Sequence, residues 1–343
     1  MEDKRNLKPQ PANHRDAISL MAPAADVSSV VGSDRDELTK WFHLYLTCEE
    51  DSGSHTCRAK VTDLNWFLAF FLADSGGYHC DDWTRGRTKT FIKWIRRQIS
   101  AKTGNRLAPT TCRRIFDTAR HAATWIHRQR PFLAGDPFRE VDGITLDEPN
   151  WQGLSTLEVN RLKTAAEQLI SIQRRATQAP RRNYAILLTM LDSGLRAFEL
   201  SELQLAQFHT RALHHIQRKG DKTTTRIPLS SDTCTAIVDY IETERGNEPG
   251  TLFQSKSGKP LAQQDVDYLL KRIAAQANSR LPLKDHIKLS PHVLRHTSLR
   301  KWAATKGVRF AQRIAGHASE RYIWRYVTPS EADMDDAAES LWE

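Results

Sequence analysis

The stretch "LLTMLDSGLRAFELSEL", residues 187–203, decides the fold of the C-terminal half of this chain. It begins as an apolar helix, breaks at Ser193 and Gly194, and continues with Arg196 and Glu199. A glycine at such a break readily adopts the left-handed backbone conformation that ends a helix. The break frees Arg196 from a helix face and can aim its guanidinium into a cleft, although a surface arginine after a helix end is the plainer interpretation.

A second stretch, "LSPHVLRHTSLRKWAA", begins at Leu289. Its serine is a typical helix N-cap, and the proline after it suits the first helical position. His292 and Arg295 then lie one turn apart on the same helix face, near the positive end of the helix dipole, where anions bind. His296 lies beside them and is the alternative histidine, since a single histidine on an amphipathic helix is usually structural.

Two further stretches carry ionisable groups. In "HHIQRKGDKTTTRIPLS", residues 214–230, a Gly-Asp turn lies between strand-like segments, which predicts a β-hairpin with Lys219 and Lys222 at its tip. A lysine on a turn is normally solvated, but a hairpin could deliver an ammonium to a phosphate and a leaving oxygen. In "GHASERYIWRYVTPS", which begins at Gly316, Tyr322 and Tyr326 either pack a helix, or one of them is a nucleophile assisted by the preceding histidine.

Together the four stretches resemble the tyrosine recombinase (phage integrase) family, over roughly residues 34–330. The matching motifs, in chain order, are "SGLRAFEL", "KGDK", "HVLRH" and "AGHASERYIWRY". Each motif alone is weak, but their order and spacing make a strong joint signal, because Arg196 and Lys219 are 23 positions apart and His317 and Tyr326 are nine apart. The usual leucine before the Gly-His pair is Ala315 here.

The resemblance implies a site-specific DNA recombinase. A tyrosine hydroxyl attacks a phosphodiester and leaves a 3′-phosphotyrosine and a free 5′-hydroxyl, and strands are exchanged pairwise through a Holliday junction. The covalent bond conserves the phosphoester energy, so neither ATP nor a metal is required and no cofactor is expected. The family pattern makes Tyr326 the nucleophile, since Tyr322 lies only five positions after the histidine.

The other family positions fall on five residues. Arg196 and Arg295 would clamp the non-bridging oxygens of the phosphorane, and His317 would add a hydrogen bond to them. Lys219 is the expected general acid on the leaving 5′-oxygen, with Lys222 the less favoured lysine. His292 would take or orient the proton of the attacking tyrosine.

Two alternatives remain at this point. A DNA-binding protein on the same fold would not cleave, although it would have no chemical need for all six family positions. A type IB topoisomerase shares the tyrosine chemistry, and it would relax supercoiled plasmid that has no recombination site.

The chain divides into four segments. Residues 1–33 form a flexible N-terminal arm, 34–141 an all-helical core-binding domain, 142–153 a linker, and 154–343 a mainly helical α+β catalytic domain with a small antiparallel sheet. Helices are expected near 33–46, 62–73, 87–101 and 109–129, and a capping box of Ser155 and Glu158 starts the second domain. The fold class is therefore mainly α, and the family implies a C-shaped clamp around duplex DNA.

Charge supports a polyanionic partner. Lys and Arg number 50 against 41 Asp and Glu, a net charge of +9. The third and fourth helical stretches are rich in basic residues with few acids. A solvated helix face would look similar, but DNA-backbone contact is the stronger interpretation. The candidates for it are Lys93, Arg96, Arg97, Arg113, Arg114 and Arg120.

Other sequence features narrow the class of protein to which this chain can belong. The longest apolar run, residues 64–73, is too short to span a bilayer, and the N-terminus has no apolar core of signal-peptide type, so a cytoplasmic, nucleoid-associated protein is expected. The five cysteines fit reduced thiols better than disulfides. A zinc site among Cys48, His55, Cys57, His79 and Cys80 is conceivable, but no C-x-x-C pair supports it, and none is predicted.

The resemblance also bears on assembly. The C-terminal segment places Met334, Ala338, Leu341 and Trp342 on one helical face, and such a helix commonly docks on a neighbouring protomer in this family. A homotetramer on synapsed DNA, bound to an inverted-repeat core site, is the implied assembly. The target sequence, any accessory protein, and the choice among transposon, phage, integrative element and dimer resolution are not encoded in these motifs.

Overall fold

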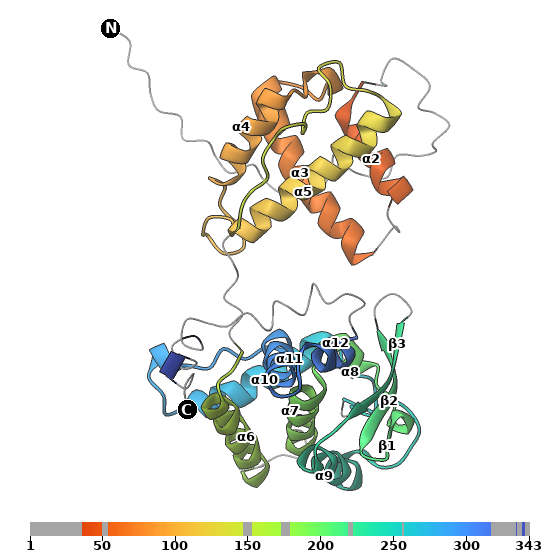
Figure 1. The fold of residues 1–343 in the computed structure, drawn as a ribbon, viewed down its shortest axis with the longest axis vertical. Helices are drawn as coiled ribbons and strands as arrows, with labels where there is room; N and C mark the ends of the chain where they lie inside the picture. Colours follow the sequence, from red (N-terminus) through yellow and green to blue (C-terminus); the bar gives the residue numbers. More distant parts are fainter. Residues whose placement is uncertain are drawn as a thin grey trace. The chain divides into compact units, whose positions relative to one another are not determined.

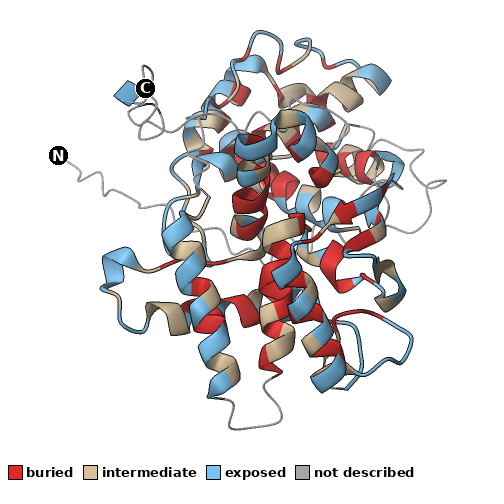
Figure 2. Cartoon of the chain, turned by 60° about the horizontal axis from the view of Figure 1, so that its bottom comes forward, coloured by how far each residue is buried: buried red, intermediate tan, exposed pale blue. Residues whose placement is uncertain are grey.

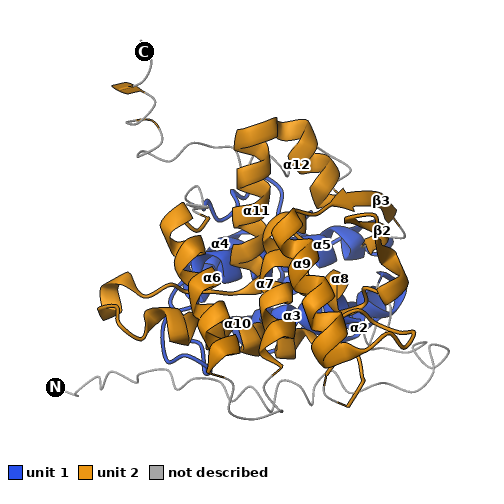
Figure 3. Cartoon of the chain, turned by 90° about the horizontal axis from the view of Figure 1, so that it is seen from below, with its two compact units in different colours: residues 1–149 blue, residues 150–343 orange. Residues whose placement is uncertain are grey.

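The computed structural model describes residues 36–49, 54–146, 153–172, 179–218, 222–255 and 257–316, with Met334, Ala338 and Glu339 (Figure 1). The chain divides into two compact units, residues 1–149 and 150–343 (Figure 3). The described part is mainly helical with one small antiparallel sheet, which confirms the expected fold class. The N-terminal arm, Leu341 and Trp342 lie outside the described residues.

Unit 1 is built from helices around an aromatic core. They are α2 (Leu38–Glu49), α3 (His55–Ser75), the 3₁₀ turn η2 (Cys80–Asp82), α4 (Arg85–Ile95) and α5 (Pro109–Gln129). Trp83 is fully buried, and its ring centroid lies 4.4 Å from that of Phe67. The Ser54 hydroxyl accepts from the Cys57 N–H at the start of α3, and Gly76 ends the helix at φ +78°. In Figure 2, which colours the chain by burial, many helices carry buried residues on one side and exposed residues on the other.

The prediction for α4 was wrong at its C-terminal end. The helix stops at Ile95 instead of continuing to 101, because the next residues form a tight turn with their own hydrogen bonds. The Ser100 N–H donates to the Asn105 carbonyl at 2.8 Å, and the Leu107 N–H donates to the Gln98 carbonyl at 2.9 Å. These cross-turn bonds satisfy backbone groups that a longer helix would have used.

Unit 2 combines helices with a three-stranded sheet. Its helices are α6 (Thr156–Ser171), α7 (Pro180–Ser193), α8 (Ala197–Ser201), α9 (Ser231–Tyr240), α10 (Gln263–Asn278), α11 (Pro291–Lys306) and α12 (Val308–Ala315), with short turns η4 (Leu205–Gln207), η5 (Ile241–Arg245) and η6 (Leu283–Asp285). The strands are β1 (Phe208–His209), β2 (Ala212–Arg218) and β3 (Lys222–Pro228), in the order β1-β2-β3. The predicted hairpin is confirmed, since β2 and β3 pair antiparallel with Arg218 opposite Lys222.

Helix α7 forms the middle of this unit. It packs against α6, α9 and α11, and nearly all its apolar side chains are buried, as expected for a helix covered on several sides (Figure 1). At the start of α6 the predicted capping box is confirmed, because the Ser155 hydroxyl and the Glu158 carboxylate each accept from the other's backbone N–H. No helix among the described residues is long and apolar enough to cross a membrane.

A buried carboxyl group lies inside unit 1. The Asp63 side chain is 1% exposed, accepts a 2.9 Å hydrogen bond from the Thr118 hydroxyl, and pairs with the Arg114 guanidinium at 2.8 Å. Burial raises the pKa of Asp63 to about 6, against the opposing effects of Arg114 and Thr118. The folded state therefore binds this proton more tightly than the unfolded chain does.

This raised pKa predicts a pH dependence of stability. Between the ordinary Asp value of 3.8 and about 6, the folded state holds more protons, so the free energy of unfolding falls as the pH rises through this window. Asp63→Asn should abolish this pH dependence of the free energy of unfolding. At about 1.36 kcal/mol per pKa unit, the shift from 3.8 to about 6 corresponds to a fall of up to about 3 kcal/mol. Urea unfolding followed by tryptophan fluorescence at pH 4 to 7 measures it.

Thr62→Ala, an exposed change one position earlier, is the matched control and should keep the wild-type slope. An Asp63→Asn protein with the same slope as the wild type would show that Asp63 is not the titrating group.

Candidate active site

The break after α7 is the first element of the site. Helix α7 ends at Ser193, and Gly194 follows at φ +57° with its N–H donating to the Met190 carbonyl, as the sequence predicted. A Cβ at Gly194 would lie 3.2 Å from the Ser298 hydroxyl and 3.3 Å from a Leu299 methyl. The conformation and the closeness of α11 both favour glycine here, and the turn places Arg196 at the N-cap of α8.

Glu199 is the centre of the site. Its carboxylate accepts from the Arg196 N–H at 2.9 Å, from the Arg196 guanidinium at 2.8 Å and from the Arg218 guanidinium at 2.5 Å. Arg295 lies 3.8 Å from the same carboxylate. Burial alone would raise the pKa of Glu199, but the charge of Arg218, the hydrogen bonds of Arg196 and the charge of Arg295 lower it overall, so the group is ionised.

Arg295 joins the other parts of the site. It comes from the first turns of α11, where the Ser290 hydroxyl caps the Val293 N–H and a proline begins the helix, as predicted. Its guanidinium is 4% exposed and donates to the Gly194 carbonyl at 2.5 Å and to the Ala315 carbonyl at 3.0 Å. These contacts tie the break after α7 to the C-terminal end of α12.

Two histidines of α11 form a pair beside the arginines. The Nε2 atoms of His292 and His296 are 2.8 Å apart, and their rings meet edge to face. Partial desolvation, with the charges of Arg295 and Arg196, lowers the pKa of His292. Burial, followed by the charges of His292 and Arg295, lowers the pKa of His296 to about 4. His292 reaches the surface while His296 is buried, so His296 is a structural neighbour that orients the His292 ring.

Arg218 was not identified as a site residue by the sequence reasoning. It ends β2 with a side chain only 2% exposed, and it donates to Glu199, to the Thr224 hydroxyl at 3.0 Å and to the Ile314 carbonyl at 2.7 Å. A Cβ at Gly316 would lie 2.9 Å from the Arg218 Nε atom. Its only sequence signal was a basic residue at a buried position of an alternating strand.

The structure brings together Arg196, His292 and Arg295 of the six predicted catalytic residues. The Arg196 side chain is 43% exposed, whereas Arg295 is almost fully covered, so Arg196 meets solvent and Arg295 lies beneath. Lys219, His317, Tyr322 and Tyr326 lie outside the described residues. Lys222 is described, and it is exposed at the first position of β3, opposite Arg218.

This arrangement suits an anion. Three guanidiniums lie within 4 Å of the single Glu199 carboxylate, and two of them, those of Arg218 and Arg295, are almost fully covered. Guanidiniums bind phosphate through paired N–H donors, and their attraction is stronger where water is excluded. Among the described residues, no group of three or more His, Cys, Asp or Glu side chains could hold a metal ion.

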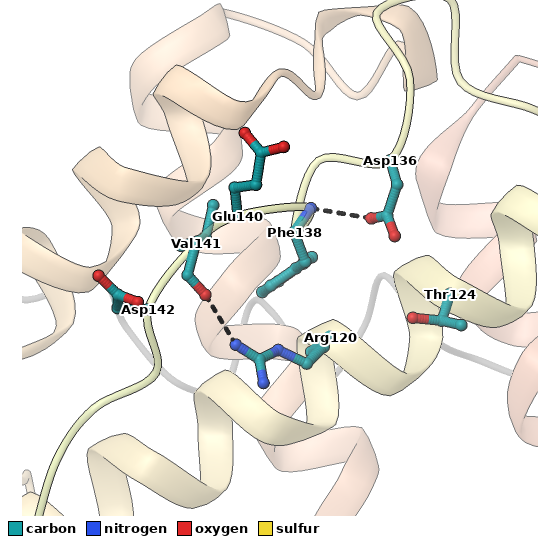
Figure 4. A pocket seen from close by; sticks show the side chains of 7 residues that line it. All are labelled: Arg120, Thr124, Asp136, Phe138, Glu140, Val141 and Asp142. Carbon is teal, nitrogen blue, oxygen red and sulfur yellow. Dashed lines mark hydrogen bonds between the residues drawn. The ribbon is translucent and has the colours of Figure 1, made fainter.

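The predicted DNA-binding arginines of α5 have partners inside unit 1. Arg113 donates to Asp117 and to the Ile144 carbonyl, and Arg114 pairs with Asp63. Figure 4 shows Arg120 donating to the Val141 carbonyl in a pocket that also holds carboxylates, those of Asp136, Glu140 and Asp142. Lys93, Arg96 and Arg97 are instead exposed at the end of α4.

Comparison with known proteins identifies the family. The family model described as the phage integrase family matches residues 156–332, which contain the whole arginine site. The chain belongs to the phage integrase family. Among its relatives, a tyrosine recombinase XerD of Listeria innocua is 26% identical over 306 residues, covering 85% of this chain and 95% of the relative. A tyrosine recombinase XerC of Halalkalibacterium halodurans is 25% identical over 307 residues, covering 85% and 93%.

Solved structures show the same fold. A lambda integrase dimer bound to a COC′ core site matches with a TM-score of 0.64 at 16% identity, over 84% of this chain and 95% of that one. The Tn1549 transposon integrase, in complex with a circular intermediate DNA, matches with a TM-score of 0.63 at 16% identity, over 88% and 98%. Phage integrase family members are tyrosine recombinases that break and rejoin DNA.

The shared carboxylate predicts a stability effect in this integrase-family domain. Glu199→Gln leaves the buried Arg218 without its charge partner, and breaking a buried ion pair from one side typically costs about 3 to 5 kcal/mol. Because the pKa of Glu199 lies below its ordinary value of 4.5, the wild-type advantage exists above that pH and is lost as the pH falls through the lowered pKa. Urea unfolding at pH 7 and at acidic pH measures both effects.

Glu202→Gln is the matched control, since Glu202 is an exposed carboxylate at the end of the same helix. A Glu199→Gln protein as stable as this control at pH 7 would contradict the central position of Glu199.

Proposed function

We propose that this chain is an active site-specific DNA recombinase that cleaves and rejoins strands through a 3′-phosphotyrosine intermediate. One observation carries the proposal. Arg196 and Arg295, which match the motifs of the family in order and spacing, lie at the buried Glu199 carboxylate, and the charges of both act on His292. A binding protein that never cleaves has no chemical use for two arginines at one buried carboxylate beside a histidine with a lowered pKa.

The arginines would stabilise the transition state. In the phosphorane, negative charge gathers on the non-bridging oxygens, and Arg196 and Arg295 are the guanidiniums that would clamp them. Glu199 holds Arg196 on both its backbone and its side chain, so part of the orientation exists before DNA binds. Preorganised donors of this kind are worth more than donors that must reorient during the reaction.

The protons would move as follows. The lowered pKa of His292 keeps its imidazole neutral at pH 7, so it can accept the hydroxyl proton of Tyr326 as the oxygen attacks phosphorus. Lys219 would donate a proton to the leaving 5′-oxygen, and His317 would donate a hydrogen bond to the phosphorane. Rejoining is the reverse, with the 5′-hydroxyl of a partner strand as nucleophile.

The assembly is proposed by analogy with the relatives. A lambda integrase, 16% identical to this chain, has been solved as a dimer on a core site and as a tetramer bound to a Holliday junction. We infer that unit 1 is the core-binding domain, that both units grip duplex DNA as a C-shaped clamp, and that four protomers exchange strands on inverted-repeat sites within the nucleoid. The C-terminal segment would pack on a neighbouring protomer.

Covalent trapping tests the chemistry. On a nicked suicide duplex that carries the cognate site, wild-type protein should form a covalent protein-DNA adduct, while Tyr326→Phe forms none because the nucleophilic oxygen is missing. DNA binding, measured by mobility shift, should persist in this variant. Denaturing gel electrophoresis of radiolabelled DNA measures the adduct.

Tyr322→Phe is the control, since it removes the other hydroxyl of the same stretch and should retain the adduct. Loss of the adduct in Tyr322→Phe and its survival in Tyr326→Phe would reverse the assignment. Absence of any adduct on a mapped binding site would favour a non-cleaving binder.

The salt dependence of DNA binding tests the α4 cations. Lys93→Ala, Arg96→Ala and Arg97→Ala should each weaken binding and reduce the slope of log K against log salt by about 1, because each removes one phosphate contact. Fluorescence anisotropy between 50 and 300 mM salt, values chosen to span the range in which counterion release is measurable, gives these slopes. Lys40→Ala is a change elsewhere in unit 1 that should leave the slope unchanged.

A further inference from the structure

Arg218 is a buried arginine that stands outside the catalytic set. Its side chain is as covered as that of Glu199, and each of its terminal nitrogens donates to a different segment of unit 2. One contacts Glu199 of α8, the other contacts the Ile314 carbonyl near the end of α12, and Nε contacts Thr224 on the opposite strand. The guanidinium is therefore fixed in its plane by three hydrogen bonds.

Burial of this group is costly. Desolvation lowers the pKa of Arg218 in spite of the Glu199 charge, so burial disfavours the cation at this position. A buried ion pair is often no more stable than an apolar replacement, so stability alone gives no reason for an arginine at this position. The surroundings are nevertheless shaped around it, because any side chain at Gly316 would collide with its Nε atom.

The location of Arg218 suggests a reason. It is the last residue of β2, and the next residue in the chain is Lys219. Its partners lie in the helix that follows Arg196 and in the last turn of α12, two residues before the Gly-His pair. Arg218 thus ties the strand end that leads to the lysine to the segment that carries the first arginine.

We propose that Arg218 is a positioning residue for the leaving-group step: it anchors the end of β2 to Glu199 and α12 and so fixes where the Lys219 turn begins. The inference rests on the proposed recombinase function. In that step the Tyr326 oxygen forms a bond to phosphorus, the bond from phosphorus to the 5′-oxygen breaks, and the Lys219 ammonium gives its proton to that oxygen.

A substrate with a better leaving group separates this role from a general structural one. Replacing the bridging 5′-oxygen by sulfur gives a thiolate, which departs without a proton because its conjugate acid is far more acidic than an alcohol. A variant that misplaces the general acid should then recover on the sulfur substrate. A variant that disturbs the arginine clamp should be equally slow on both, since the phosphorane charge remains.

Arg218→Lys is the test variant because it keeps the positive charge opposite Glu199 and loses the planar, three-way hydrogen bonding. Single-turnover adduct formation is measured on matched oxygen and 5′-sulfur suicide duplexes, each relative to wild type. We expect a loss of about 100-fold on the oxygen substrate, the lower range of general acid catalysis, and less than about 10-fold on the sulfur substrate. Arg226 is an exposed arginine on the same hairpin, so Arg226→Lys is the matched control. It should form the adduct at the wild-type rate on both the oxygen and the sulfur substrate.

A second readout keeps the test decisive if Arg218→Lys is less stable. In a Lys219→Ala background, Arg218→Lys should slow adduct formation on the oxygen substrate by less than about a further threefold. The reason is that the effects of residues that act through one step are not additive. Thr224→Val removes only the contact to the Arg218 Nε atom. It should therefore slow adduct formation on the oxygen substrate less than Arg218→Lys does, and it should recover on the sulfur substrate in the same way.

The outcomes are distinguishable. Equal losses on the two substrates, full additivity with Lys219→Ala, or wild-type rates in Arg218→Lys would each overturn the positioning role while the recombinase function stands. If wild-type protein forms no adduct with either duplex, the recombinase function itself fails, and the positioning role fails with it.

Discussion

The Glu199 carboxylate is the interaction on which the candidate site depends. Arg196 at the N-cap of α8, Arg218 of β2 and Arg295 of α11 lie within hydrogen-bond or ion-pair distance of it, and without a negative charge these guanidiniums would repel one another. The carboxylate makes their approach possible, yet it does not neutralise them. One carboxylate shared by three guanidiniums is the arrangement on which the proposed phosphodiester site rests.

Close backbone approach is the second constraint. Arg295 spans from the carbonyl of Gly194 to that of Ala315, and Arg218 reaches the carbonyl of Ile314. A guanidinium can bridge these segments only if the chain between them carries no obstructing side chain. Gly316 meets this requirement beside Arg218, whereas Gly194 leaves room for Ser298 and Leu299 of α11, and both glycines have positive φ angles. The glycine of the last motif therefore serves the geometry of Arg218, and that of the first motif serves the approach of α11.

The sequence predicted much of this site and missed its interior. Arg196, His292 and Arg295 could be found because they follow local signals: a helix break, an N-cap with proline, and a spacing of one turn. Arg218 could not be found in this way, since its meaning depends on partners 19 positions earlier and 96 positions later in the chain. The end of α4 was misplaced because the cross-turn bonds of residues 98–107 compete with a helix that the basic pattern alone would extend.

This basic chain holds its arginines in two different arrangements. In unit 1, Arg114 meets Asp63 and Arg113 meets Asp117, one carboxylate for each guanidinium. In unit 2, one carboxylate is shared by Arg196, Arg218 and Arg295. The net charge of +9 cannot distinguish the two cases, because it counts residues and not partners. The local ratio of guanidinium to carboxylate, set by folding, therefore differs between the two units in a way that the net charge does not show.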